Sequence, residues 1–183
     1  MKKILVPISN GTEEMEAVII IDMLRRAGCD VTVAGDGDVV VCAWGTRILP
    51  DIMIDDVADD DVYDAIVLPG GTQGVNHFIA NEQLEQIIKR HHATKSLIGA
   101  ICAAPLVLHD FGLLPDNAVV TSHPGVAETF APYTYTLERV AADGNIVTSR
   151  GAGTAFEFAL ALIRRLVDEK TSLRLASDIV MYE

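Results

Sequence analysis

Basic residues are scarce in this sequence of 183 residues, which has 14 Lys and Arg against 26 Asp and Glu and a formal net charge of -12. Binding to nucleic acid or to an anionic membrane requires clustered Lys and Arg side chains. The charge balance therefore argues against both partners. Small molecules and other proteins are the partners that we expect.

Cysteine is also rare. Cys29, Cys42 and Cys102 are an odd number at unrelated spacings, which excludes a disulfide framework and a Cys-x-x-Cys metal or redox motif. His91 and His92 are adjacent on an expected helix and point to different faces, so they are poor candidates for a shared metal. We expect three free thiols, no metal site and no cofactor.

Long apolar runs are missing too. The longest, from Leu97 to Leu108, contains Pro105 and is too short to span a membrane. The apolar stretch at the start of the chain is too short for a secretory signal. Aromatic residues make up only 5% of the chain although 50% is hydrophobic, which indicates a core of Val, Ile, Leu and Ala. We expect a soluble, cytoplasmic protein with a single domain over residues 1–183.

Runs typical of strands alternate with helical patterns along the chain. The expected strands are 3–8, 31–34, 63–68, 97–101 and 119–120, and the expected helices are 13–27, 81–92, 103–110, 153–167 and 169–180. Thr12 is the expected N-cap of the first helix, and Gly28 its end. The alternation predicts an α/β fold, a three-layer sandwich in which helices cover both faces of a mostly parallel sheet.

Shorter segments complete the expected fold. Turn residues 35–38 predict a hairpin between 31–34 and 39–43, and Asp143-Gly144 predicts a second hairpin between 133–141 and 146–148. Residues 47–49 are expected to be extended, and the acidic stretch 51–61 to be a solvated loop.

Cys102 occupies the most informative position in the chain. It follows the apolar run 97–101 and precedes Ala103-Ala104-Pro105, a favourable start for a helix. Small residues on both sides fit a sharp nucleophile elbow, and a helix N-terminus favours a thiolate. The local pattern leaves two interpretations open, a nucleophile or a small buried core residue.

Three further candidates follow other strands. These are Glu16 after the first turn, the pair Gly70-Gly71, and His123. In parallel sheets, ligands bind beyond the carboxyl ends of the strands, so we expect these residues near Cys102. Alternative interpretations are an exposed Glu16, glycines that serve only the turn, and a histidine that caps a loop.

Five motifs together resemble the ThiJ/PfpI superfamily and, within it, the DJ-one group, the parkinsonism-associated deglycase branch. They are Glu13-Glu14-Met15-Glu16, Val67-Leu68-Pro69-Gly70-Gly71, Ala100-Ile101-Cys102-Ala103-Ala104-Pro105, Thr121-Ser122-His123-Pro124 and Thr148-Ser149-Arg150-Gly151. They follow the order of the family and extend over nearly the whole chain.

The resemblance implies a flavodoxin-like sandwich and a homodimer. It also implies that Cys102 is the nucleophilic and oxidation-sensitive residue, that Glu16 is the carboxyl bonded to it, and that His123 lies nearby. Gly71 and Ala103 match the residues whose N–H groups form the oxyanion site.

Two features of the sequence qualify the resemblance. Trp44 and Arg47 lie in a stretch that departs from the family, where relatives have a basic residue near the dimer interface. Ala103 stands where protease-like relatives have histidine, which argues against peptidase activity. The resemblance assigns no role to His77 or His109.

Two function classes follow. In the first, the protein is a cofactor-independent, glutathione-independent glyoxalase or deglycase, in which the Cys102 thiolate attacks a reactive aldehyde such as methylglyoxal or a glycated protein group. In the second, Cys102 is a peroxide sensor whose sulfinate, stabilised by Glu16, reports oxidative stress or switches a chaperone. Because an ionised Glu16 would oppose a thiolate, we expect Glu16 to be protonated in the reactive pair.

Overall fold

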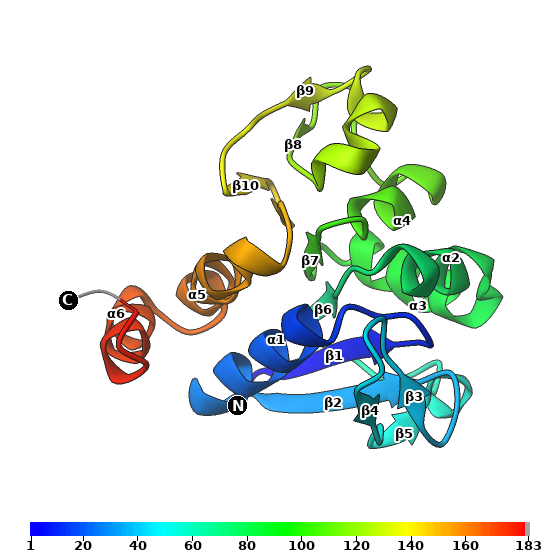
Figure 1. Cartoon of the computed structure of the whole chain (residues 1–183), viewed down its shortest axis with the longest axis horizontal. Helices are drawn as coiled ribbons and strands as arrows, with labels where there is room; N and C mark the ends of the chain where they lie inside the picture. The colour runs from blue at the N-terminus through cyan, green and yellow to red at the C-terminus, as the bar shows by residue number, and fades with distance from the viewer. Residues whose placement is uncertain (182–183) are drawn as a thin grey trace.

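The computed structural model describes residues 1–181. A seven-stranded sheet forms its centre, in the order β10-β11-β7-β6-β1-β2-β5, and only the pair β10–β11 is antiparallel (Figure 1). The strands are β1 (Lys3–Ile8), β2 (Asp30–Gly35), β5 (Ile52–Met53), β6 (Ala65–Leu68), β7 (Leu97–Ile101), β10 (Val140–Asp143) and β11 (Ile146–Ser149).

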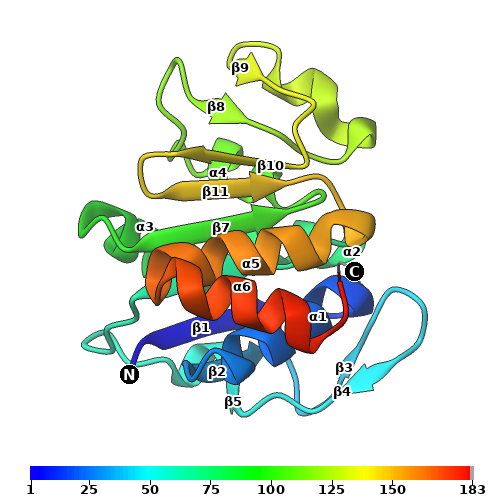
Figure 2. The same ribbon diagram turned by 90° about the vertical axis from the view of Figure 1, so that its left-hand side faces the viewer.

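Helices cover both faces of this sheet, which confirms the expected α/β class. Figure 2 shows one layer in front of the strands, formed by α1 (Glu14–Arg26), α5 (Ala155–Leu166) and α6 (Glu169–Asp178). The other face carries α2 (Thr72–Ala80), α3 (Glu82–Ala93) and α4 (Pro105–Asp110). Helix α6 packs against α5. None of the helices in residues 1–181 is long and apolar enough to cross a membrane.

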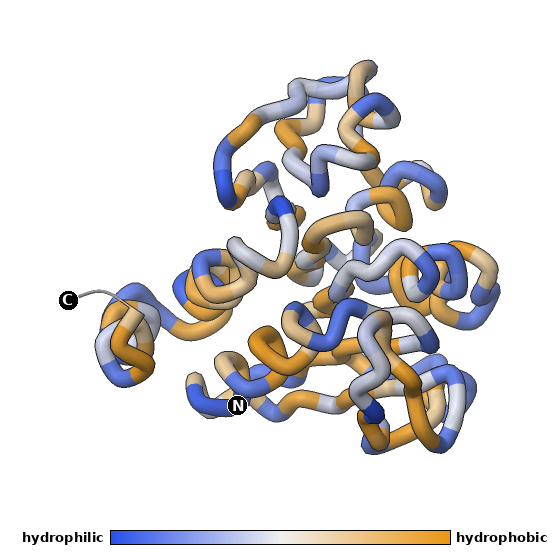
Figure 3. Tube along the Cα trace, in the orientation of Figure 1, coloured by the Kyte–Doolittle hydropathy of each residue, from blue (hydrophilic) through white to orange (hydrophobic). Residues whose placement is uncertain are grey.

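Successive residues of β1 serve the two layers. Ile4 and Val6 belong to the core under α1 and α5, whereas Leu5 belongs to the core under α2 and α3. Lys3 begins β1 and is exposed, whereas the strand is buried from Ile4 to Ile8, and its hydrophobic residues are orange in Figure 3. These two cores lie on opposite faces of the sheet, and its carboxyl edge carries the candidate residues.

The first expected hairpin is wrong. Strand β3 (Val40–Val41) pairs with β4 (Arg47–Ile48) in a separate antiparallel ribbon, while β2 pairs with β5. Asp51 explains the difference, because its N–H donates to the Val33 carbonyl at 2.8 Å and its carboxylate accepts from the Val33 N–H at 2.9 Å. The supposed acidic loop therefore begins as a strand and continues into η1 (Ile54–Asp56).

The second expected hairpin is confirmed at its turn, since β10 pairs with β11 across Asp143 and Ile146, but its first strand covers residues 140–143 and not the expected 133–141. A parallel pair of strands precedes it, β8 (Val119–Val120) with β9 (Thr134–Tyr135). Short 3-10 helices lie at η2 (Pro124–Phe130) and η3 (Ala152–Thr154).

Two expectations at helix ends have different outcomes. Gly28 follows Ala27, the C-cap of α1, with φ +81°, as expected of a helix end. The N-cap of α1 is Glu13 rather than Thr12, because the Thr12 hydroxyl accepts from the Ser9 N–H at 3.0 Å instead. Helix α2 was not expected from the sequence.

Candidate functional site

Cys102 lies between β7 and α4 in the left-handed backbone region, with φ +64°. A non-glycine residue adopts this conformation only when its surroundings hold it there. Its N–H donates to the Ser149 carbonyl at 3.0 Å, and its carbonyl accepts from the His123 N–H at 2.8 Å. The cysteine is therefore fixed to two other segments at the carboxyl edge of the sheet, as the elbow interpretation requires.

Gly70 brings Glu16 and Cys102 together. A Cβ atom on Gly70 would lie 2.5 Å from Cys102 Cβ and 2.7 Å from Glu16 Oε2, so only glycine fits between them. The Gly70 N–H donates to Glu16 Oε2 at 2.7 Å, and the Gly70 carbonyl accepts from the Glu13 N–H at 2.9 Å. These bonds fasten the first turn of α1 to the end of β6, directly behind the cysteine.

Glu16 is fully buried, with 0% of its surface exposed. Its Oε1 atom has no hydrogen-bond partner within residues 1–181. Burial raises the pKa of this carboxyl to about 7, although the Gly70 N–H and the Cys102 thiol lower it. With a pKa of about 7, both the protonated and the ionised form of Glu16 are populated near neutral pH.

Burial also raises the pKa of the Cys102 thiol, to about 12, and the charge of Glu16 adds to the rise. The N–H groups of Gly71 and Ala103 lower it. The contribution of Glu16 exists only while that carboxyl is ionised. Formation of a thiolate is therefore coupled to protonation of Glu16, and the helix N-terminus alone does not produce it.

The negative charge of the pair can reside on either group. On sulfur, two amide N–H groups stabilise it, and Cys102 is partly exposed at a cavity. On Glu16, the Gly70 N–H and the Cys102 thiol stabilise it, in a fully buried position. The lower pKa of Glu16 makes it the first of the pair to ionise, so a thiolate requires the proton to reside on Glu16, and solvent at the cavity then stabilises the charge on sulfur.

A cavity of about 520 Å³ opens in front of the sulfur. Among its lining residues are Gly71, Cys102, Ala103 and His123, which therefore share one site with Glu16 behind them. Gly71 has φ +93°, and a Cβ there would lie 2.3 Å from the Gly11 carbonyl oxygen. This backbone conformation, which favours glycine, holds the Gly71 N–H near Cys102.

His123 lies at the cavity as expected, and it also caps a loop. Its Nδ1 accepts the Gly125 N–H at 3.1 Å. In the neutral ring this assigns the proton to Nε2, which is then a hydrogen-bond donor. Both interpretations of this histidine are therefore compatible with the structure.

The sequence did not single out several residues of the cavity wall. They are Gly11, Glu13, Ala43, Thr72, Gln73, Gly125 and Val126. Trp44 also lines the cavity with 84% of its surface exposed, on a loop that the Glu14 carboxylate holds by accepting the Trp44 N–H at 3.1 Å. In the sequence, the indication that this loop is distinctive was that the stretch with Trp44 and Arg47 departs from the family pattern.

The remaining thiols lie apart from the cavity. Cys29 and Cys42 are buried, and both are free. Burial raises the pKa of both, to about 11 for Cys42, where the charge of Glu14 adds to the rise. Neither thiol is activated.

The other histidines do not join the site. His91 accepts the Tyr63 N–H at 3.0 Å, and His109 contacts the Tyr133 hydroxyl at 3.0 Å. His77 lies 3.4 Å from Asp36, and His92 lines a different cavity. Residues 1–181 contain no group of three metal-ligating side chains.

A parallel α/β sandwich with a strained cysteine between a strand and a helix defines a class of flavodoxin-like proteins with a nucleophile elbow. Within it the chain belongs to the DJ-1/PfpI family, whose model matches residues 2–165.

Relatives and solved structures agree over almost the whole chain. The Parkinson disease protein 7 homolog of Danio rerio is 37% identical over 98% of this chain and 97% of its own. The crystal structure of Drosophila melanogaster DJ-1beta has a TM-score of 0.93 at 39% identity, covering 98% of this chain and 97% of that one. The glutathione-independent glyoxalase DJR-1.2 of Caenorhabditis elegans is 37% identical over 87% of this chain and 86% of its own.

Proposed function

We propose that this DJ-1-type stress protein is a cofactor-independent enzyme that acts on reactive carbonyls, with Cys102 as its nucleophile. Small aldehydes such as methylglyoxal, or early glycation groups on proteins, are the substrates. The observation that carries the proposal is the pairing of a fully buried Glu16 with a strained Cys102 at a cavity. The glyoxalase relative supports the same chemistry.

The reaction begins with neutral Glu16 and a Cys102 thiolate. The sulfur attacks the aldehyde carbon, a C–S bond forms, and the C=O electron pair moves to oxygen. The Gly71 and Ala103 N–H groups, which already stabilise the sulfur, lie close enough to stabilise this oxyanion. Glu16 then protonates the oxygen and becomes a carboxylate.

The second half converts the hemithioacetal into product. Carboxylate Glu16 removes the proton from the former aldehyde carbon, and the neighbouring ketone oxygen takes up a proton as the C=C bond of an enediol forms. Glu16 then returns its proton to the neighbouring carbon, and the former aldehyde hydroxyl loses its proton as its oxygen becomes the carbonyl of a thioester on Cys102. Water hydrolyses the thioester to a 2-hydroxy acid, lactate in the case of methylglyoxal, and frees the thiol. A general base is most effective with a pKa near the operating pH, and the pKa of Glu16 is about 7.

His123 has a supporting role in this scheme. Because its Nδ1 accepts the Gly125 N–H, Nε2 is the nitrogen that is free to donate to a substrate oxygen. We assign it to hydrogen bonding with the substrate and leave proton removal to Glu16.

Loss of methylglyoxal and formation of lactate, measured without glutathione, test the proposal. Cys102→Ser should abolish turnover, whereas the matched change Cys29→Ser should preserve it, because Cys29 lies outside the cavity. Turnover by Cys102→Ser would overturn the enzymatic role.

A second candidate function is peroxide sensing, favoured by the partial exposure of Cys102 beside two amide N–H groups. Two molecules of hydrogen peroxide would oxidise the thiolate to sulfenate and then sulfinate, releasing two waters. Peptide mass spectrometry should then find two added oxygens on Cys102 before any on Cys29 or Cys42. Earlier oxidation of the buried thiols would count against this function, and with it against a redox-switched chaperone.

We also propose a homodimer formed around α1 and the neighbouring loop. Met15 and Val18 on α1 are 56% and 50% exposed, and Trp44 adds a large apolar side chain nearby. Exposed apolar clusters of this kind typically mark interfaces. Light scattering at micromolar concentration should give twice the chain mass, and a monomer mass would refute the dimer. The free thiols support a reducing compartment such as the cytoplasm.

A further inference from the structure

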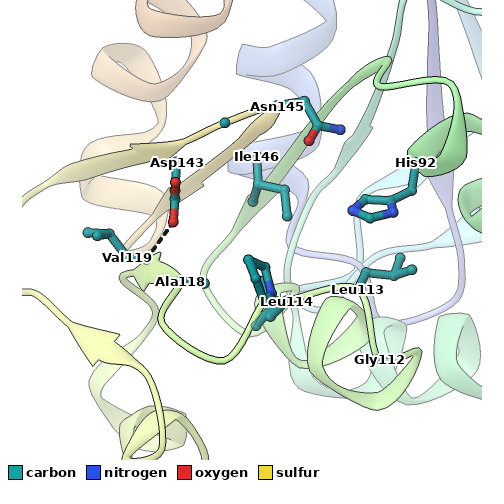
Figure 4. A pocket seen from close by; sticks show the side chains of 11 residues that line it. His92, Gly112, Leu113, Leu114, Ala118, Val119, Asp143, Asn145 and Ile146 are labelled. Carbon is teal, nitrogen blue, oxygen red and sulfur yellow. Dashed lines mark hydrogen bonds between the residues drawn. The ribbon is translucent and has the colours of Figure 1, made fainter.

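A second cavity lies at the other edge of the sheet, away from Cys102. It has a volume of about 320 Å³ and lies beside the start of β11, between the β10–β11 turn and the loop that follows α4 (Figure 4). Cys102 follows the end of the neighbouring strand β7, whereas this cavity adjoins the amino ends of the parallel strands. It therefore belongs to no part of the proposed active site.

The walls of this cavity are mainly apolar. Leu113, Leu114 and Ile146 line it, and each is less than 10% exposed. The Asp143 carboxylate accepts the Val119 N–H at 2.9 Å, and the Asn145 amide donates to the Ser96 carbonyl at 2.8 Å. Few polar groups remain to hold water, so an apolar ligand would replace poorly bound water.

A basic hollow adjoins this cavity and shares His92, Gly144 and Asn145 with it. Lys95 and Arg165 line the hollow, and neither forms an ion pair with an acid in the described part of the chain. The Arg165 guanidinium donates to the Gly144 carbonyl, which fixes it beside the shared wall. In a chain of net charge -12, two unpaired cations at one hollow are a local exception.

We propose that the cavity and the hollow together bind a small amphipathic carboxylate. Its apolar part occupies the cavity between Leu113, Leu114 and Ile146, and its carboxylate lies toward Lys95 and Arg165. Asp143 lines the same cavity, and one of its carboxylate oxygens accepts the Val119 N–H. The negative charge of Asp143 opposes a ligand that would place its own carboxylate inside the cavity. The ligand is thereby oriented with its charge outward, and the site is independent of the Cys102 chemistry.

Sodium hexanoate is the probe for a titration of the isotope-labelled protein followed by amide NMR shifts. We expect saturable shifts at Gly112, Gly144 and Asn145, and no saturable shifts at Gly71 or Ala103. Hexanol lacks the charge and acetate lacks the apolar chain, so each should bind at least about tenfold more weakly than hexanoate. Equal binding of hexanol, or shifts confined to the Cys102 cavity, would overturn the proposal.

Paired variants test the two cations. Lys95 has φ +60°, so Lys95→Gly removes its charge without backbone strain. Combined with Arg165→Gln, it should weaken hexanoate binding by about tenfold or more, which corresponds to the loss of charge-assisted hydrogen bonds. Arg164→Gln, a neighbouring cation outside the hollow, is the matched control and should leave binding unchanged. The same NMR spectra verify the fold, and unchanged affinity in the double variant would refute the site.

Discussion

Replacing Glu16 by Gln separates the two protonation states of the central pair. The change keeps a neutral group of similar size behind the cysteine and removes any negative charge. Since one point near Gly70 is 2.5 Å from Cys102 Cβ and 2.7 Å from Glu16 Oε2, those two atoms are at most about 5.2 Å apart. At about 5 Å and an effective dielectric constant of about 20, an ionised Glu16 would oppose the thiolate by about 3 kcal/mol, or about two pKa units.

Thiolate ultraviolet absorbance, followed against pH, measures the outcome. If Glu16 is neutral beside the thiolate, Glu16→Gln should move the Cys102 pKa by less than about one unit. Turnover of methylglyoxal should nevertheless fall by about 10²-fold or more, because an amide cannot transfer the proton. Glu138→Gln is the matched control, since Glu138 is exposed and lies outside the cavity. A decrease of two units or more in Glu16→Gln would refute the assignment of the proton to Glu16.

Two further predictions concern stability. Because burial raises the pKa of Glu16 from 4.5 to about 7, its protonated form stabilises the fold fully below about pH 4.5, and this contribution is lost as pH rises through about 7. Urea unfolding should therefore show wild type losing up to about 3 kcal/mol relative to Glu16→Gln between pH 4.5 and 7.5, and parallel pH profiles would contradict the shift. Gly70→Ala should lower the free energy of unfolding by about 1–3 kcal/mol and impair turnover, because the added Cβ has no room beside Cys102 and Glu16. Gly153→Ala is the control, because a Cβ added at Gly153 would have no neighbouring atom within 4 Å.

Local sequence patterns predicted the features that depend only on residues close together in the chain. The strand, cysteine and proline around Cys102 indicated an elbow, and its φ of +64° confirms a strained backbone there. Glu16 alone looked like an exposed acid; only the family pattern indicated that it is buried. Its contact with Gly70 joins residues 54 positions apart, which periodicity cannot reveal.

Failures occurred where tertiary contacts override local signals. The sequence did not predict α2, in which Gly74 packs closely against the main chain of Thr12; a Cβ on Gly74 would lie 2.8 Å from the Thr12 nitrogen. The turn after β2 predicted a hairpin, but Asp51 bonds to Val33 and directs β5 to that edge. The pKa of the Cys102 thiol likewise depends on burial and on Glu16. The sequence indicated only the helix N-terminus beside the thiol, and neither of these two larger effects.

Rapid acid quenching of the protein during methylglyoxal turnover, followed by peptide mass spectrometry, tests the nucleophile most directly. The proposed route passes through a thioester, so the peptide that contains Cys102 should carry the added mass of one methylglyoxal during turnover and lose it when substrate is exhausted. Peptides that contain Cys29 or Cys42 should remain unmodified, because these thiols are buried. Turnover to lactate with no adduct on Cys102, or with adducts only on the buried thiols, would contradict the account.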